Sequence, residues 1–148
     1  MIRLSRVNGL VLATLGLALT SACGSGSVAA SDHPTPACRS TLAPVSVPDD
    51  GTFPTDWPFP PGTVITATEA VPGGGLAITG QVGSSFEGVL PFMQHDLEKA
   101  GFVATKGEAE HDDAEATWSG NGYQGSWAIK SSETCEGTTL LQVAAAKQ

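Results

Sequence analysis

The chain has 148 residues and is acidic, with 15 Asp and Glu against 7 Lys and Arg and a formal net charge of −8 at pH 7. Apart from Arg3 and Arg6, its basic residues are widely scattered: Arg39, Lys99, Lys106, Lys130 and Lys147. Nucleic acids and anionic bilayer surfaces are bound by clustered Lys and Arg. The composition therefore argues against both kinds of partner, and the length without residues 1–22 fits one small domain.

The first 22 residues have the pattern of a secretory signal. Arg3 and Arg6 form a basic start, residues 7–19 are largely apolar, and small residues follow at 20–22. A basic region, a short apolar region and a small-residue cleavage site are the three parts of a signal peptide. The apolar run is shorter than the roughly 20 residues of a membrane-spanning helix. We therefore expect residues 1–22 to be removed.

Cys23 follows the small residues directly, and this arrangement resembles the lipobox of bacterial lipoproteins, although Thr20 stands where a lipobox usually has Leu. In those proteins the cysteine takes a lipid on its sulfur and becomes the mature N-terminus. The resemblance implies a protein held by a lipid at Cys23 on the extracytoplasmic face of the cell membrane. The alternative is plain secretion after cleavage at Ala22, with Cys23 unmodified.

The two other cysteines, Cys38 and Cys135, form an even pair once Cys23 is assigned to the lipid. In an oxidising compartment the simplest expectation for such a pair is a disulfide. Closing so long a loop is worth about 4 kcal/mol in the entropic model. A metal site is the weaker alternative because no C-x-x-C spacing is present.

Residues 23–37 are expected to be a flexible tether, because Gly and Ser dominate its start and Pro34 and Pro36 occur near its end. Residues 38–148 are expected to be a single domain. Its first part, residues 38–62, is rich in proline, which excludes a helix or a central strand. We expect this part to be extended chain lying over the domain, with Phe53, Trp57 and Phe59 as apolar contacts.

The rest of the chain shows strand patterns on both sides of one helix pattern. Short β-branched or alternating runs predict strands over residues 63–68, 76–82, 102–105, 114–118, 125–131 and 138–145. Asn121-Gly122 is a strong hairpin turn signal between two of them. The prediction is an α+β domain of two layers, in which one helix packs on an antiparallel sheet of about six strands in the order β-β-α-β-β-β-β.

The helix is expected over residues 86–100. Phe86, Val89, Met93 and Leu97 fall on one stripe, and Gly101 is a stop signal. Ser84 and Glu87 have the spacing of a capping box. Pro91 removes one helical hydrogen bond, so we expect a kink or an irregular first turn, with regular helix from about Leu90.

Several of these features together resemble small cell-envelope lipoproteins of the actinobacterial type. They are Pro60-Pro61-Gly62-Thr63, the following hairpin, the helix end at residues 97–102, and Cys135-Glu136-Gly137. The resemblance covers about residues 54–145. It implies a location and an architecture, and it assigns no activity and no functional residue.

The densest polar segment is residues 108–115, with Glu108, Glu110, Asp112, Asp113 and Glu115 around His111. Closely spaced oxygen ligands can hold a calcium ion, but the EF-hand spacing is absent. The simpler interpretation is a solvated hairpin loop. His33, His95 and His111 are dispersed and predict no zinc site, so we expect no metal site and no cofactor.

No motif for nucleophilic catalysis is present: the chain lacks a G-x-S-x-G elbow and a phosphate-binding loop. Paired carboxylates for glycoside chemistry remain open, because acids distant in sequence can meet in space. The sequence therefore favours a non-enzymatic protein and predicts no catalytic residue.

The aromatic residues Trp57, Trp118, Tyr123 and Trp127 are the remaining candidates for a site. Trp118 and Trp127 are expected on one face of a hairpin, packed beneath the helix. The alternative is a surface groove for a peptide, glycan or lipid, with Tyr123 at its rim.

From these observations we expect a lipid-anchored envelope protein whose domain binds a partner protein or a small ligand. An enzyme acting on envelope polymers and a divalent-cation binder using residues 108–115 are the alternatives.

Overall fold

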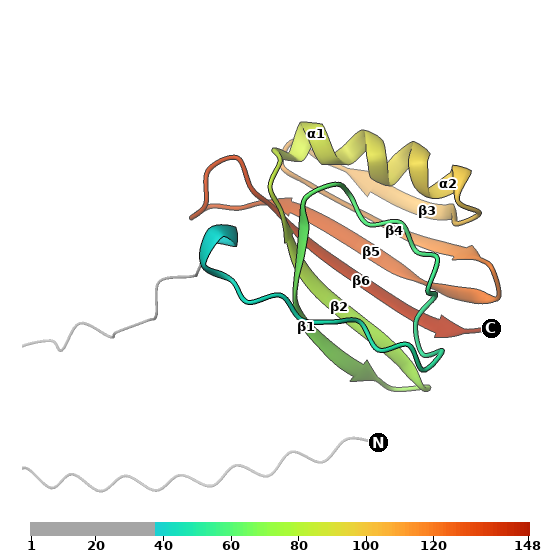
Figure 1. Ribbon diagram of the computed structural model, residues 1–148. Coiled ribbons are helices and arrows are strands. Elements are labelled where there is room, and N and C mark those ends of the chain that lie inside the picture. Colours follow the sequence, from blue (N-terminus) through green and yellow to red (C-terminus); the bar gives the residue numbers. More distant parts are fainter. Residues whose placement is uncertain (1–37) are drawn as a thin grey trace, which may run out of the picture. The chain divides into compact units, whose positions relative to one another are not determined.

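The computed structural model describes residues 38–148, so the predicted signal peptide (1–22), Cys23 and the tether (23–37) lie outside the described residues. The described part holds a short 3₁₀ turn, one longer helical segment and a six-stranded sheet with the strand order β1-β2-β6-β5-β4-β3 (Figure 1). All five strand pairs are antiparallel. The strands are β1 (Thr63–Val71), β2 (Gly75–Val82), β3 (Val103–Ala109), β4 (Asp113–Gly120), β5 (Tyr123–Ser131) and β6 (Thr139–Lys147). The α+β class with an antiparallel sheet is confirmed.

The apolar side chains of the sheet gather on one face because successive residues of a strand point to opposite sides. The register makes Ile78, Val143, Trp127 and Ala116 neighbours in one row across four strands. Each of them is buried. This apolar face forms the floor of the core.

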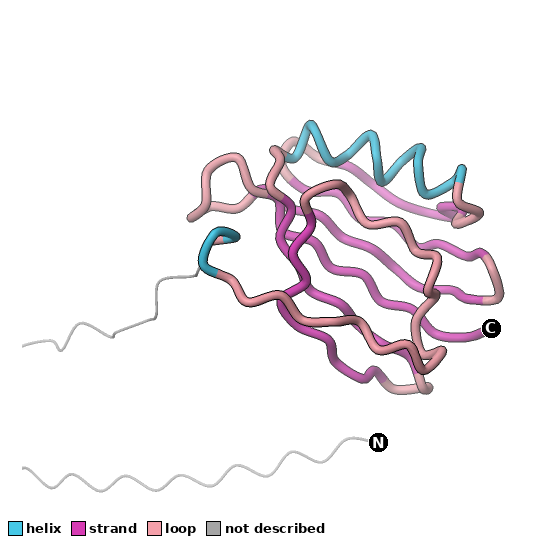
Figure 2. Tube along the Cα trace, in the orientation of Figure 1, coloured by secondary structure: helices cyan, strands magenta, loops and turns pink. Residues whose placement is uncertain are grey.

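The helical segment lies over this face beside β3 and β4 (Figures 1 and 2). It consists of α1 (Phe86–Pro91), a π-helical turn η2 (Phe92–Asp96) and α2 (Leu97–Lys99). Its apolar stripe is buried, as the spacing predicted: Phe86, Val89, Met93 and Leu97. The capping-box prediction is wrong, because the N-cap is Ser85 rather than Ser84 and makes no side-chain cap bond.

The segment ends at Gly101, as predicted. Gly101 has a φ of 90°, and its N–H donates to the carbonyl of Glu98 at 3.0 Å while that of Phe102 donates to Leu97 at 3.0 Å. This pair of bonds is a Schellman motif, in which a left-handed glycine satisfies the last carbonyls. Leu97 and Phe102 are both buried and supply its apolar contact.

The irregularity expected at Pro91 is present but lies after the proline. The first turn is regular α-helix up to Pro91, and the π turn follows at once, with the N–H of Leu97 donating to the carbonyl of Phe92. Proline has no N–H for the bond to the residue four positions earlier, which loosens the hydrogen-bond register beside it. The expectation of regular helix from Leu90 is therefore wrong.

The proline-rich segment (residues 38–62) covers the part of the apolar face that the helix leaves free (Figure 1). After the 3₁₀ turn η1 (Arg39–Thr41) it forms no helix or strand and contains bends at residues 50–53 and turns at residues 55–56 and 61–62. Phe53 and Trp57 are buried in the core. The Trp57 ring centroid lies 4.5 Å from that of Trp118 and 4.8 Å from that of Phe102. The segment thus contributes side chains to the hydrophobic core of the domain.

The predicted disulfide joins Cys38, at the start of this segment, to Cys135 in the loop between β5 and β6, with 5.7 Å between the Cα atoms. The helix and the proline-rich segment together cover one face of the sheet. The opposite face, which we call the open face, carries exposed residues such as Thr79 of β2, Gln142 of β6 and Glu115 of β4, and neither the helical segment nor the proline-rich segment covers them.

Candidate functional site

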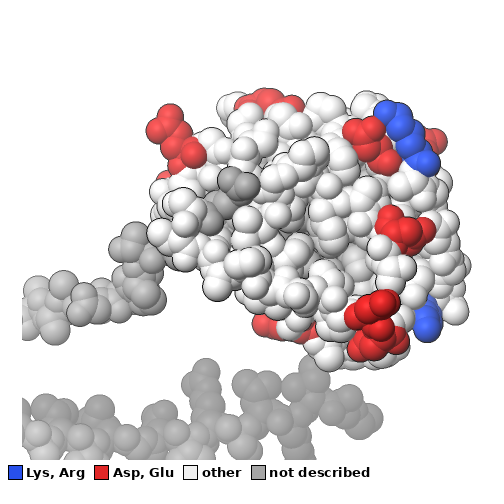
Figure 3. Space-filling model, in the orientation of Figure 1, with Lys and Arg blue, Asp and Glu red and all other residues white. Residues whose placement is uncertain are grey.

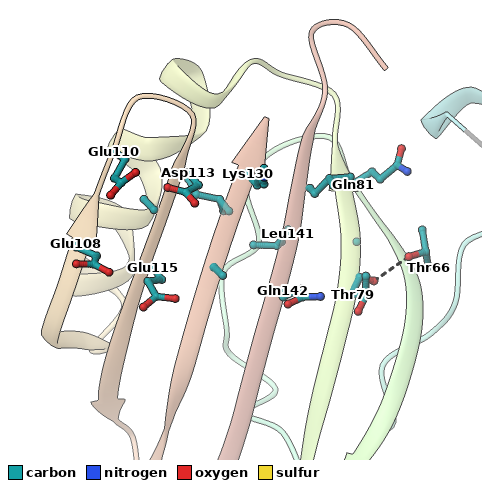
Figure 4. Close-up of a pocket in the computed structure, with 15 residues that line it drawn as sticks. Thr66, Thr79, Gln81, Glu108, Glu110, Asp113, Glu115, Lys130, Leu141 and Gln142 are labelled. Carbon is teal, nitrogen blue, oxygen red and sulfur yellow. Dashed lines mark hydrogen bonds between the residues drawn. The ribbon is translucent and has the colours of Figure 1, made fainter. Parts of the chain in front are cut away.

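The open face carries a groove with a volume of about 480 Å³ that crosses the sheet from β1 to the β3–β4 hairpin (Figure 4). The groove is lined by polar side chains at its two ends and by small or apolar residues between them. Its acidic end is formed by Glu108, Glu110, Asp113 and Glu115, with Lys130 beside them. Its other end is formed by Thr66, Thr79, Gln81 and Gln142. The floor between the two ends includes Ala128 and Leu140. Its volume lies within the range of ligand sites in proteins, about 300–1,000 Å³.

The acidic end is built by the β3–β4 hairpin. Glu108 and Glu115 are direct partners in the register, so their carboxylates project side by side from the same face (Figure 4). Like charges placed opposite each other on neighbouring strands destabilise a sheet. No ion pair of Glu108 or Glu115 is present within residues 38–148. These carboxylates therefore form a concentration of negative charge that the described domain does not neutralise.

Among residues 38–148, Lys130 is the single cation that lines the groove. It is the register partner of Asp113 on one side and of Leu140 on the other. Its ammonium lies 3.9 Å from the Glu133 carboxylate, at the edge of an ion-pair distance. Lys130 thus lies between the acidic end and the apolar floor, and it forms no ion pair with Glu108 or Glu115.

The opposite end carries hydroxyl and amide groups. A bulge between Ile65 and Ala67 turns Thr66 so that its hydroxyl donates to the carbonyl of Thr79 at 3.2 Å. Gln81 and Gln142 add amides, which can donate as well as accept hydrogen bonds. Leu140, which is 39% exposed, supplies apolar surface between the two ends. The groove is therefore acidic at one end and neutral and polar at the other.

The acidic stretch predicted as a hairpin loop is mostly strand. Glu108 lies in β3 and Asp113 and Glu115 in β4, so only residues 110–112 form the turn. The turn is closed by the N–H of Glu110, which donates to the carbonyl of Asp113 at 2.8 Å. Within residues 38–148, no group of three or more His, Cys, Asp and Glu side chains is arranged to hold a metal ion.

Three of the four aromatic candidates are buried in the core. Trp57, Trp118 and Trp127 are only 5%, 2% and 4% exposed, respectively, and belong to the core. The sequence placed Trp118 and Trp127 on the same face, and that face is the buried one. Tyr123 is half-buried, and its hydroxyl donates to the carbonyl of Gly51 at 3.1 Å, which ties the proline-rich segment to β5.

The two carboxyl groups of residues 38–148 with shifted pKa values, Asp50 and Glu87, lie outside the groove. Two hydrogen bonds from Thr52, by its hydroxyl at 2.6 Å and its N–H at 2.9 Å, lower the pKa of Asp50. Hydrogen bonds from its own backbone amide and from Ser85 lower the pKa of Glu87. Neither residue lines the groove, so both shifts belong to local loop and helix structure.

Sequence reasoning missed the groove, although it named its acidic residues. The alternation of polar and apolar residues along each strand does indicate which side chains point away from the core, such as Thr79 and Gln81 in β2 and Gln142 in β6. What the sequence did not supply was the order of the strands, which places β6 between β2 and β5.

The chain matches no protein-family model, no curated protein and no solved structure. None of the helices in the described residues has the length and apolar character needed to cross a bilayer. The groove and the sequence pattern at the N-terminus are therefore the two features that bear on function.

Proposed function

We propose that this chain is a lipid-anchored lipoprotein on the extracytoplasmic face of the cell membrane, and that its domain is a non-enzymatic binding module. The binding site is the groove on the open face. The observation that carries the proposal is the pair of unneutralised carboxylates, Glu108 and Glu115, at one end of a depression that crosses the sheet. Their repulsion is relieved when a positively charged group lies between them.

The ligand that fits best is an extended, positively charged peptide segment of an envelope protein. Six strands spaced by about 4.8 Å give a path of roughly 24 Å, which is the length of about seven extended residues. Lysine or arginine side chains of such a segment meet the carboxylates at the β3–β4 end. Its backbone meets the amides of Gln81 and Gln142, and its apolar atoms meet Leu140. The open face leaves room for a chain to lie across the strands.

The anchor is supported by the N-terminal pattern and by the cysteine count. Small residues lead into Cys23 as in a lipobox, and the family resemblance is to small envelope lipoproteins of the actinobacterial type. The disulfide between Cys38 and Cys135 is typical of a protein in an oxidising compartment. With both of these cysteines paired, Cys23 is the one cysteine of the three left for a lipid.

The binding proposal is tested with a fluorescent seven-residue peptide of alternating Lys and Gly, titrated with the protein at low salt. Glu115→Gln is expected to weaken binding by about two- to fivefold, the effect of removing one exposed charge pair. The matched control is Glu69→Gln, because Glu69 is exposed on the same sheet but does not line the groove.

Both variants change the net charge equally. An equal effect of the two would show that the peptide responds only to the overall negative charge, and it would remove the groove as the site. A peptide of alternating Glu and Gly is expected to show no binding.

A further inference from the structure

The two edges of the sheet differ in how they are protected. At the β1 edge, the proline-rich segment approaches closely enough for the N–H of Val45 to donate to the carbonyl of Ile65 at 2.9 Å. At the β3 edge, no strand within residues 38–148 pairs with the side of β3 that faces away from β4, and all seven residues of β3 are exposed. An unpaired strand edge is a template for pairing with another strand.

The backbone groups available on this edge follow from the hairpin that closes it. The N–H of Glu110 donates across to Asp113, so the backbone of Glu110 faces β4. Since the direction of these groups alternates along a strand, Gly107 and Ala109 direct their N–H and C=O groups to the outer edge. A partner strand therefore forms its hydrogen bonds at Gly107 and Ala109.

The charges along β3 are arranged to complement themselves. Lys106 and Glu108 flank Gly107 and project from the open face, because they are register partners of Thr117 and Glu115. Neither takes part in an ion pair within the described domain. When a second β3 pairs antiparallel with Gly107 on the two-fold axis, Lys106 lies opposite Glu108 of the second copy, and Glu108 lies opposite Lys106 of the second copy.

The two neighbouring registers are less favourable. Shifting the pairing by two residues in one direction places Lys106 opposite Lys106, and shifting it in the other direction places Glu108 opposite Glu108. Like charges directly opposite each other destabilise a strand pair, whereas opposite charges stabilise it. The register with Gly107 on the two-fold axis also places Lys106 of the second copy next to Glu108 and Glu115, whose like charges repel each other.

The helices do not obstruct this arrangement. The helical segment runs diagonally, from contacts of α1 with β5 to contacts of α2 with β3. When two copies pair antiparallel, α2 of one copy lies at the same end of the junction as α1 of the other copy. That α1 lies over β5, two strands away from the junction, so the two helices do not meet there. The bulge at Thr105 limits the shared ladder to a short stretch.

We propose that the chain forms a symmetric dimer through antiparallel pairing of β3 with β3 of a second copy, with Gly107 on the axis and two reciprocal pairs of Lys106 with Glu108. The dimer joins two six-stranded sheets into one and leaves both grooves open on the same side. Because the two-fold axis is perpendicular to the sheet, the proline-rich segments of both copies lie on the opposite face of the joined sheet.

A charge-swap series measured by sedimentation velocity on the full chain, purified in mild detergent, tests the dimer. Lys106→Glu places two pairs of glutamates in contact, and Glu108→Lys places two pairs of lysines in contact. Each is expected to weaken dimerisation by about tenfold, and the double variant is expected to restore it. Glu69→Lys, at the β1 edge, makes the same charge change as Glu108→Lys and is expected to leave the dimer intact.

A monomer at every concentration tested would overturn the proposal, as would a dimer that Lys106→Glu does not weaken or a double variant that remains monomeric. Thermal melting of each variant separates a loss of pairing from a loss of folding. Peptide binding by Glu115→Gln is a separate measurement, so failure of the dimer is distinguishable from failure of the groove.

The register is tested by oxidative cross-linking of differently tagged copies. A mixture of Lys106→Cys and Glu108→Cys copies is expected to form more disulfide-linked dimer than either variant alone. The unsubstituted chain is the control, because any dimer that it forms must be linked through a native cysteine such as Cys23. A stronger cross-link from Lys106→Cys alone would contradict the register. Gly107 itself is unsuitable for cysteine, because a Cβ there would lie 2.5 Å from the carbonyl oxygen of Glu115.

Discussion

At the scale of single residues, Trp57 has the most consequential position. It comes from the proline-rich segment, yet its ring lies against Phe102 after the helix and Trp118 in β4. Three parts of the chain that are distant in sequence meet at this one indole. The sequence marked Trp57 as an apolar contact, and the contact partners follow only from the folded structure.

Replacing Trp57 therefore separates the proline-rich segment from the core. Trp57→Ala is expected to lower the free energy of unfolding by about 3–5 kcal/mol, the usual cost of deleting a buried tryptophan. Urea denaturation followed by far-UV circular dichroism measures it. The smaller change Trp57→Phe should cost less, and a loss below about 1 kcal/mol in the alanine variant would contradict the packing described.

Glu115 illustrates a conflict between stability and the proposed function. Glu115 lies directly opposite Glu108, so Glu115→Gln is expected to raise the free energy of unfolding by about 0.2–1 kcal/mol while it weakens peptide binding. Glu69→Gln, away from this pair, serves as the control in the same denaturation experiment. A stability that falls in Glu115→Gln would show that the two carboxylates do not repel each other.

Asp50 gives the domain a small dependence on acid pH. Hydrogen bonds from Thr52 lower its pKa in the folded state, so Asp50 contributes stability above the pKa of the unfolded chain and loses it as the pH falls through the folded pKa. Asp50→Ala is expected to destabilise at neutral pH and to match the unsubstituted protein in strong acid. Melting temperatures across the acid range measure this, and a difference independent of pH would contradict it.

At the scale of elements, the turns were more predictable than the strand ends. Asn121-Gly122 forms the predicted turn, with φ angles of 51° and 83° that these two residue types tolerate. By contrast, β3 was expected to end at residue 105 and continues to Ala109. Residues 106–109 have no apolar alternation, and it is pairing with β4 that holds them as strand.

The groove depends on this extension and on a long-range pairing. Without the longer β3, Glu108 would not be fixed beside Glu115. The pairing of β6 between β2 and β5 then places Gln142 beside Thr79 and Ala128. Local sequence patterns determine which side of a strand is apolar, but they do not determine which strands are neighbours. For this reason the helix, the hairpins and the disulfide could be predicted, whereas the groove could not.

The disulfide is the element whose removal tests how the proline-rich segment is held. Cys38 and Cys135 are 97 residues apart in sequence. The double variant Cys38→Ser and Cys135→Ser is expected to lose up to about 4 kcal/mol in the free energy of unfolding, chiefly because the unfolded chain gains freedom. Amide hydrogen exchange should show the largest change in residues 38–52. Unchanged stability would mean that burial of Phe53 and Trp57 suffices to hold the segment.

At the scale of the whole molecule, the two faces of the sheet have different roles. One is sealed by the helix and the proline-rich segment, and Figure 3 shows this side with acidic side chains confined to its margins. The other is open and carries the groove. The described domain begins at Cys38, fifteen residues after Cys23, so in the proposed lipoprotein a short tether joins the domain to its anchor. In that proposal the groove is accessible to other proteins of the envelope.

In the proposed lipoprotein, the lipid at Cys23 determines where the groove acts. Intact-mass spectrometry of the protein extracted from the membrane fraction of cells that produce it naturally tests this directly. The expected mass is that of a chain beginning at Cys23 with a diacylglycerol on its sulfur and the other two cysteines joined. A chain that begins at another residue, or a Cys23 without lipid, would contradict it.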